Sequence, residues 1–206
     1  MGLMRMKLKL VICILAFILV SASVAYAFQW KTYDTKGHYK AKNTWISVRY
    51  PGHWTAAEGN RPNIIQKFTY YDQNTQIQYM LMLQIIDLPK GVTQESNVWP
   101  EDEWILLGQD LALEQNLRVR NIEKIRHEGQ NGIIIKCYGI DERVGLKLYF
   151  ELDYMYLMYN DKFIILGCYT GGALDAQQSI TNSHFSDSIR GIYMQYFNSL
   201  IIMEKY

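Results

Sequence analysis

Cysteine and proline are scarce in this chain of 206 residues, which has only three of the first and four of the second. One of the cysteines, Cys13, lies in a leader-like segment described below. The remaining two are too few for a domain stabilised mainly by disulfides, so the fold has to depend on a hydrophobic core. Hydrophobic residues make up 49% of the chain and charged residues 20%, which is the balance of an ordinary globular protein.

The chain also lacks the short motifs that carry common chemistry. It contains no H-E-x-x-H, C-x-x-C or G-x-S-x-G motif, no P-loop and no glycine-rich dinucleotide fingerprint. Its four histidines (His38, His53, His127 and His184) are scattered, so we expect no metal site, no cofactor and no catalytic residue. A hydrolase with a dispersed active site is an alternative, in which His53 or His127 would meet a carboxylate in a cleft.

The first residues have the pattern of a secretory signal peptide. Three basic residues and an unbroken apolar run precede Ala25-Tyr26-Ala27, whose small residues a signal peptidase accepts. We therefore expect a leader over residues 1–27 and one domain over 28–206, in the periplasm or outside the cell. A membrane anchor formed by an uncleaved leader is the alternative, although its apolar run over 10–20 is short for a bilayer span of about 20 residues.

Positive charge is not concentrated in the expected mature domain. Of the 21 Lys and Arg residues, three lie in residues 1–27, where there is no Asp or Glu, which leaves 18 basic against 20 acidic side chains. Nucleic-acid binding draws much of its affinity from basic side chains that neutralise phosphates. We therefore expect no nucleic-acid partner.

Hydrophobic periodicity predicts strands joined by tight turns, with two main helices. Period-two alternation predicts seven strands, over 45–50, 64–71, 76–87, 119–127, 133–140, 146–159 and 163–170. Pro100 and the acidic residues after it suit the first turn of a helix that runs to about Asn116. Helical spacing predicts a second helix over 185–201, and a short one is expected over 173–181.

The strand over 146–159 decides the expected architecture. One of its faces is apolar throughout, whereas the other begins polar and ends with Met155, Leu157 and Tyr159. A strand face that is apolar over only half its length indicates that another element packs on part of that face. We therefore expect an α+β fold in which an antiparallel meander sheet packs between helices, an α/β/α sandwich. In the alternative, both helices cover one face, and these three residues form an exposed patch for a partner.

Two other predictions concern single side chains. Turns near residues 143 and 160–161 place Cys137 opposite about residue 149 and Cys168 opposite about residue 153, too far apart for a disulfide, so both thiols are expected to be free and buried. Trp54 and Trp99 lie in or beside loops, which makes them candidates for an aromatic binding cleft.

The order of these elements resembles the PsbP-like superfamily, which includes DcrB-like bacterial envelope proteins. The resemblance rests on the Tyr-Pro-Gly-His-Trp turn at 50–54, the helix with an acidic start, the meander and the closing segment at 197–202, and it covers about residues 44–203. It implies an accessory, assembly or binding role without a shared catalytic set. We thus expect a non-enzymatic exported protein that binds a protein partner, or alternatively an immunity protein that neutralises a toxin delivered to the envelope.

Overall fold

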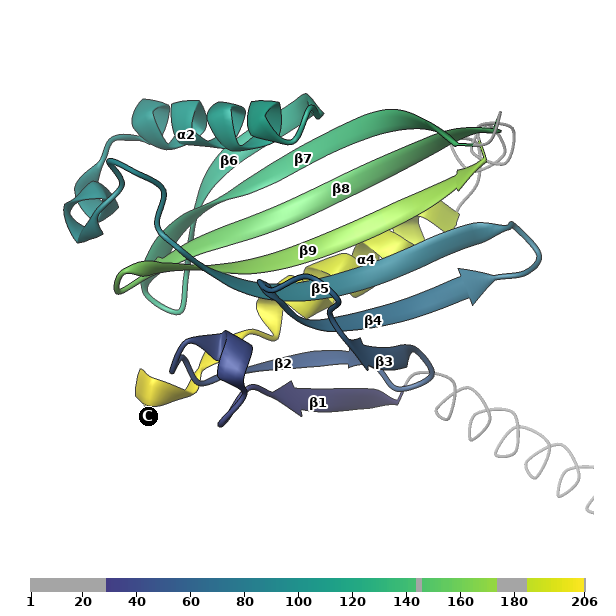
Figure 1. Cartoon of the computed structure of the whole chain (residues 1–206), viewed down its shortest axis with the longest axis horizontal. Helices are drawn as coiled ribbons and strands as arrows, with labels where there is room; N and C mark the ends of the chain where they lie inside the picture. The colour runs from purple at the N-terminus through teal and green to yellow at the C-terminus, as the bar shows by residue number, and fades with distance from the viewer. Residues whose placement is uncertain (1–28, 144–145, 174–184, 206) are drawn as a thin grey trace, which may run out of the picture.

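The computed structural model describes residues 29–143, 146–173 and 185–205 (Figure 1). The predicted leader over 1–27 and nearly all of the short helix expected over 173–181 lie outside these residues.

The described residues form ten strands, two α-helices and three 3-10 helices. The strands are β1 (Trp30–Asp34), β2 (Ile46–Pro51), β3 (Thr55–Glu58), β4 (Ile64–Asp72), β5 (Ile77–Asp87), β6 (Arg118–His127), β7 (Gln130–Arg143), β8 (Leu146–Tyr159), β9 (Lys162–Ala173) and β10 (Ile201–Ile202). The helices are η1 (Tyr39–Ala41), η2 (Gln94–Val98), α2 (Glu101–Glu114), α4 (Phe185–Asn198) and η3 (Met203–Lys205).

All strand pairs are antiparallel, and they form two sheets. The larger sheet has seven strands in the order β3-β4-β5-β9-β8-β7-β6, and the smaller has three in the order β1-β2-β10. In the large sheet, β5 pairs with β9, which lies far along the chain, and this pairing joins the β4–β5 hairpin to the β6–β9 meander. The small sheet is likewise closed by distant parts of the chain, because β10 follows α4.

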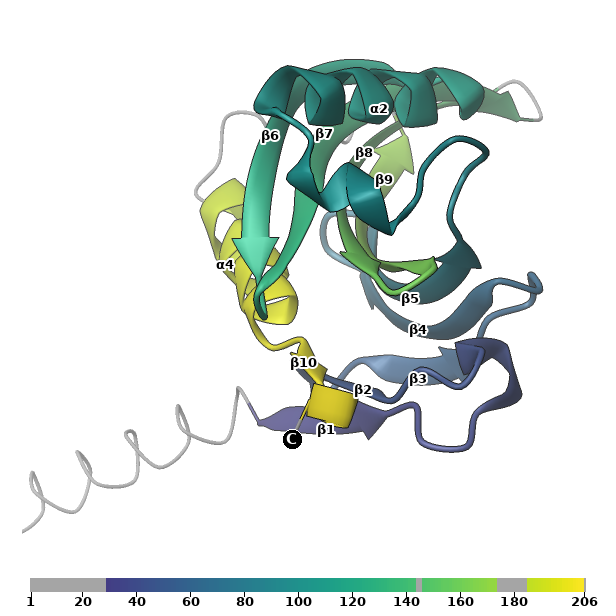
Figure 2. The ribbon, with the colours of Figure 1, turned by 90° about the vertical axis from the view of Figure 1, so that its left-hand side faces the viewer.

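The two faces of the large sheet are covered differently (Figure 2). On one face, Trp104, Leu111 and Ala112 of α2 pack with strand residues into one buried cluster. On the other face, residues of α4 and of the small sheet, such as Tyr196 and Val48, pack into a second cluster. We call these the α2 side and the α4 side.

The predicted sandwich of a sheet between helices is wrong. The molecule is mostly β, with two antiparallel sheets, and the α4 side is covered by the three-stranded sheet as well as by a helix. Sequence analysis missed β1, β3 and β10, which are only two to five residues long. Strands this short show too few alternations for a periodic signal, and they form because a neighbouring strand pairs with them.

The longer elements were predicted correctly. Each of the seven predicted strands is present with ends shifted by a few residues, and the helix after Pro100 is α2. The terminal helix is α4, although the helix ends at Asn198 and the chain then enters β10. In α2, Gly108 lets the helix approach the sheet closely, since a Cβ there would lie 2.9 Å from the Ile122 side chain.

Cys137 and Cys168 are free and buried, as predicted. Cys168 pairs with Asp153, the expected row, whereas Cys137 pairs with Leu152 rather than with a residue near 149. Leu152 and Asp153 are neighbours on β8, so the offset between the two cysteines along the strand direction is smaller than expected. The thiols stay apart because β8 lies between their strands and because Cys137 points to the α2 side and Cys168 to the α4 side.

Both thiols are expected to resist alkylation in the folded protein. Burial, with a smaller contribution from Asp153, raises the pKa of Cys137 to about 12 and that of Cys168 well above its ordinary value. At about pH 8, where an ordinary thiol of pKa about 8.5 is partly ionised, neither forms the reactive thiolate. Iodoacetamide labelling followed by mass spectrometry should show no adduct on either residue until urea is added.

The same shift fixes the direction of the pH dependence of stability. A thiol whose pKa is higher in the folded state stabilises the fold fully below its unfolded pKa of about 8.5, and this contribution is lost as the pH rises toward 12. Rapid labelling of folded protein at about pH 8 would contradict the burial of these thiols.

Candidate functional site

A groove of about 400 Å³ lies between α2 and the loop that follows β5. Its apolar lining comes from Val92 and Trp99 on the loop side and from Leu106, Leu107 and Leu111 on the helix. We call it the α2 groove. A concave, largely apolar surface with a few polar groups at its edge is the usual form of a binding site.

Acidic side chains border this groove along the helix. Glu103, Asp110 and Glu114 all line it, and their spacing of seven and four residues places them on one stripe of an α-helix. Over its 14 residues, α2 carries five acidic side chains and no basic one. Of the described residues on the opposite wall, Lys90 is the one cation. The groove thus combines an apolar floor with a rim that is mainly negative.

The wall opposite α2 is fixed to the sheet by hydrogen bonds. Lys124 on β6 donates from Nζ to the Trp99 carbonyl at 2.7 Å, and Asn131 on β7 donates from Nδ2 to the Asn97 carbonyl at 2.6 Å. Nearer the groove, the Val92 amide donates to the Pro89 carbonyl at 3.0 Å across a tight turn. The first two bonds fix the end of the loop at Asn97 and Trp99 to the sheet, and the third closes the turn that carries Val92.

Two large apolar side chains beside the groove are exposed. Leu106, which lines it, is 54% exposed, and Val98, next to Trp99, is 87% exposed. Isolated exposed hydrophobic residues are common on protein surfaces, but apolar residues on a concave surface are typical of interaction sites.

Only one of the two predicted cleft tryptophans lies in this groove. Trp99 lines it, whereas Trp54 is 4% exposed and packs on the α4 side, with its ring stacked 6.0 Å from that of Tyr70. The expected cleft between Trp54 and Trp99 therefore does not form. The sequence places both near loops, but it does not show that the loops are on opposite faces of the sheet.

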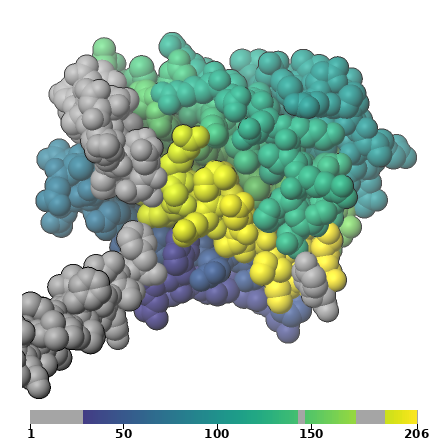
Figure 3. Space-filling view, turned by 180° about the vertical axis from the view of Figure 1, so that it is seen from behind, coloured from purple at the N-terminus to yellow at the C-terminus, as the bar shows by residue number. Residues whose placement is uncertain are grey.

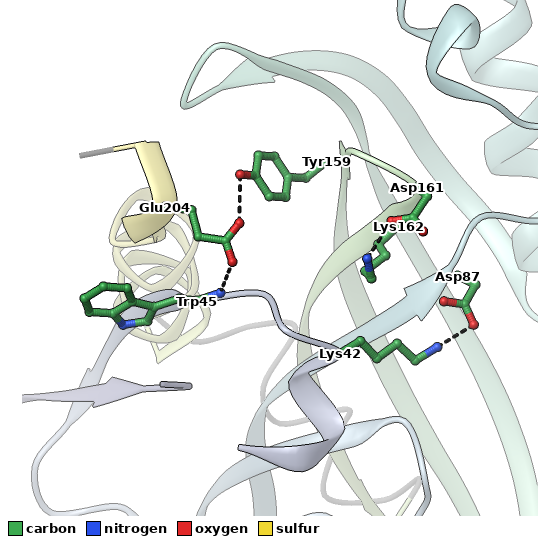
Figure 4. Close-up of polar contacts among 7 residues, drawn as sticks. All are labelled: Lys42, Trp45, Asp87, Tyr159, Asp161, Lys162 and Glu204. Carbon is green, nitrogen blue, oxygen red and sulfur yellow. Dashed lines mark hydrogen bonds and ion pairs between the residues drawn. The ribbon is translucent and has the colours of Figure 1, made fainter. Parts of the chain in front are cut away.

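Met155 and Leu157 do not form the expected surface patch. They are 2% and 0% exposed and belong to the core on the α4 side. Tyr159 is half-buried at the edge of this core, and its hydroxyl donates to the Glu204 carboxylate at 3.0 Å (Figure 4). Glu204 also accepts the Trp45 amide at 2.9 Å, so the end of the chain covers this edge.

The histidines named for a dispersed active site, His53 and His127, contact different parts of the fold. His53 packs edge-on against Tyr70, and burial lowers its pKa, while His127 has its Nε2 3.0 Å from the Leu200 carbonyl. Among residues 29–143, 146–173 and 185–205, no group of three or more His, Cys, Asp or Glu side chains could hold a metal ion. Within those same ranges, no helix has the length and apolarity needed to cross a membrane.

The described residues form a seven-stranded antiparallel sheet with a helix on one face and a helix plus a small sheet on the other. No protein-family model and no curated protein sequence matches the chain. Among solved structures, it is similar to the Ran-binding protein Mog1p of Saccharomyces cerevisiae, with 8% identity and a TM-score of 0.50 over 85% of this chain and 96% of that one.

A second similar structure is LpqN of Mycobacterium tuberculosis, which is involved in cell envelope biogenesis. It has 10% identity and a TM-score of 0.42, over 81% of this chain and 90% of that one. At 8% identity, the likeness to Mog1p shows a shared fold alone. No family model matches the chain, so the PsbP-like resemblance of the sequence stays a prediction.

Proposed function

We propose that this protein is a non-enzymatic accessory or binding protein of the bacterial envelope, and that the α2 groove holds a segment of a protein partner. The observation that carries this proposal is the combination of an apolar floor with an acidic rim. The groove lies between α2, which packs on the sheet, and a loop that is hydrogen-bonded to the sheet at Asn97 and Trp99. Mog1p, a Ran-binding protein, shows that a protein of this fold can serve protein binding.

Charge complementarity indicates the chemistry of the partner. Glu103, Asp110 and Glu114 outnumber Lys90 around the floor, so the segment that fits is basic and carries apolar side chains. Its apolar side chains would cover Trp99 and Leu106, and its Lys or Arg side chains would meet the acidic rim. Rim charges act mainly on the association rate and on specificity, while buried apolar anchors supply most of the affinity.

Site-specific photo-crosslinking tests the location of the interface. With Leu106→p-benzoylphenylalanine in the native host, we expect a defined protein adduct, because this side chain is at the groove. The same change at Leu113, which is 75% exposed but does not line the groove, is the matched control. The proposal requires an adduct from position 106 alone whose crosslinked peptide contains Lys or Arg; no adduct, or equal adducts from both positions, would contradict it.

Charge reversal tests the contribution of the rim. We expect Asp110→Lys with Glu114→Lys to weaken binding of the captured partner about tenfold, since each charge pair contributes on the order of 0.5–1 kcal/mol. The control, Glu123→Lys with Glu142→Lys, makes the same charge change at exposed strand positions outside the groove. Surface plasmon resonance at two salt concentrations measures both. Equal weakening by the two pairs would show an effect of net charge and not of the groove.

A further inference from the structure

A second pocket, of about 380 Å³, lies between the small sheet and the C-terminal end of α4. It is lined by Trp30, Arg49, Gln195, Asn198 and Ser199. We call it the Trp30 pocket. Figure 3 shows the surface of α4 beside that of the β1–β2 hairpin on this side of the molecule. The pocket shares no lining residue with the α2 groove.

Strand register and helix spacing bring these side chains together. Arg49 pairs with Thr32, two residues along β1 from Trp30, so Trp30 and Arg49 are diagonal neighbours on one face of the small sheet. On α4, Gln195 is three and four residues before Asn198 and Ser199, so the three share one side of the chain as the helix ends.

Ser199 fixes the two halves of the pocket to each other. Its hydroxyl accepts the Arg49 amide at 2.8 Å and donates to the Tyr196 carbonyl at 2.7 Å. The strand and the helix end are therefore joined directly beneath the pocket. Trp30 is half-buried, while the side chains of Arg49, Gln195 and Asn198 are exposed. The lining thus offers an anchored aromatic ring surrounded by polar groups that water can reach.

This set of side chains matches the chemistry of a sugar ring. A pyranose has an apolar C–H face that packs on an indole, and hydroxyl groups at its edge that bond to planar amide and guanidinium groups. Among the described residues that line the pocket, none carries a carboxylate, and Arg49 is the one charged side chain. A volume of 380 Å³ is near the lower end of the range of about 300–1,000 Å³ for ligand pockets, which suits one or two sugar rings.

The position at the end of α4 favours a neutral ligand over an anion. The C-terminus of a helix carries the negative end of the helix dipole, which opposes an anion drawn by Arg49. We propose that the Trp30 pocket binds a neutral saccharide unit, with Trp30 stacking on the ring and Arg49, Gln195 and Asn198 bonding its hydroxyls.

Nuclear magnetic resonance of the full ¹⁵N-labelled chain tests this assignment with three probes. These are a β-1,4-linked trimer of N-acetylglucosamine, maltotriose and inorganic phosphate. We expect at least one sugar to shift the Trp30 indole signal saturably with a dissociation constant in about the millimolar range, and phosphate to leave it unchanged. A response to the first sugar alone indicates an amino-sugar glycan, and a response to maltotriose alone indicates a glucan.

Variants show whether the response depends on the pocket. Because these variants lack the Trp30 indole, sugar binding to them is followed by the side-chain amide signals of Gln195 and Asn198, which also line the pocket. Trp30→Ala should weaken sugar binding at least tenfold and Trp30→Tyr only a few-fold, because tyrosine keeps a stacking surface. Trp99→Ala, in the other groove, should leave it unchanged. No sugar-dependent shift of Trp30 in the wild-type protein at about 10 mM would overturn the proposal, whatever the variants do. So would an equal shift by phosphate, or an equal loss in Trp99→Ala.

Discussion

Trp104→Ala is expected to lower the free energy of unfolding by about 3–5 kcal/mol, the usual cost of truncating a fully buried large aromatic side chain. Trp104 is 0% exposed and attaches α2 to the large sheet. Its ring packs edge-to-face on Trp99, with centroids 6.3 Å apart, and Lys124 Nζ lies 6.0 Å from its centroid. Alanine would leave a cavity among these groups and loosen the helix that forms one wall of the α2 groove.

Urea denaturation followed by circular dichroism measures this effect. Leu113→Ala is the control on the same helix, because Leu113 is 75% exposed and its truncation should cost little. Trp104→Phe should cost much less than alanine, because the indole Nε1 is buried without a hydrogen-bond partner among the described residues, and phenylalanine removes that unpaired group. A loss under about 1 kcal/mol for Trp104→Ala would show that α2 does not depend on this anchor.

Tyr196→Ala is expected to have a similar effect on the opposite side of the sheet, again about 3–5 kcal/mol. Tyr196 is 0% exposed, its hydroxyl donates to the Met82 carbonyl at 2.9 Å, and its ring meets Phe68 edge-on with centroids 6.4 Å apart. It thus links α4 to the centre of the large sheet through both packing and one buried hydrogen bond.

Two further variants separate these contributions. Tyr196→Phe keeps the ring and should cost only about 1–2 kcal/mol, the usual range for a buried hydrogen bond of this kind. Met194→Ala, at a residue of α4 that is 43% exposed, is the matched control and should be close to neutral. If Tyr196→Phe cost as much as Tyr196→Ala, the hydrogen bond and not the packing would hold the helix.

The two candidate sites differ in how far the sequence could predict them. The helix that carries the α2 groove and the loop position of Trp99 are both visible as local patterns. Lys90 and Val92 carry no signal of their own, because they reach the groove only through the path of the loop across the sheet. The Trp30 pocket gave no signal at all, since Trp30 and Gln195 are far apart in the chain and meet through β1, which sequence analysis missed.

Cys137 and Cys168 illustrate a correct prediction with an incomplete reason. The expected distance along the strands was too large, because the turn before β8 was placed imperfectly and the register shifted with it. The prediction of two free thiols still holds, because successive residues along a strand point to opposite faces of the sheet. Cys137 and Cys168 are paired with consecutive residues of β8, so their sulfurs lie on opposite sides of the sheet.

The sequence by itself determined the long strands, both helices and the pairing within the β6–β9 meander. These features depend on side-chain periodicity and tight turns, which act between residues close together in the chain. Only the tertiary structure decided that β5 pairs with β9, that a three-stranded sheet helps to cover the α4 side, and that Met155 and Leu157 are buried beneath that cover. Alternation shows that a strand has an apolar face, but the segment that covers it is chosen by long-range packing.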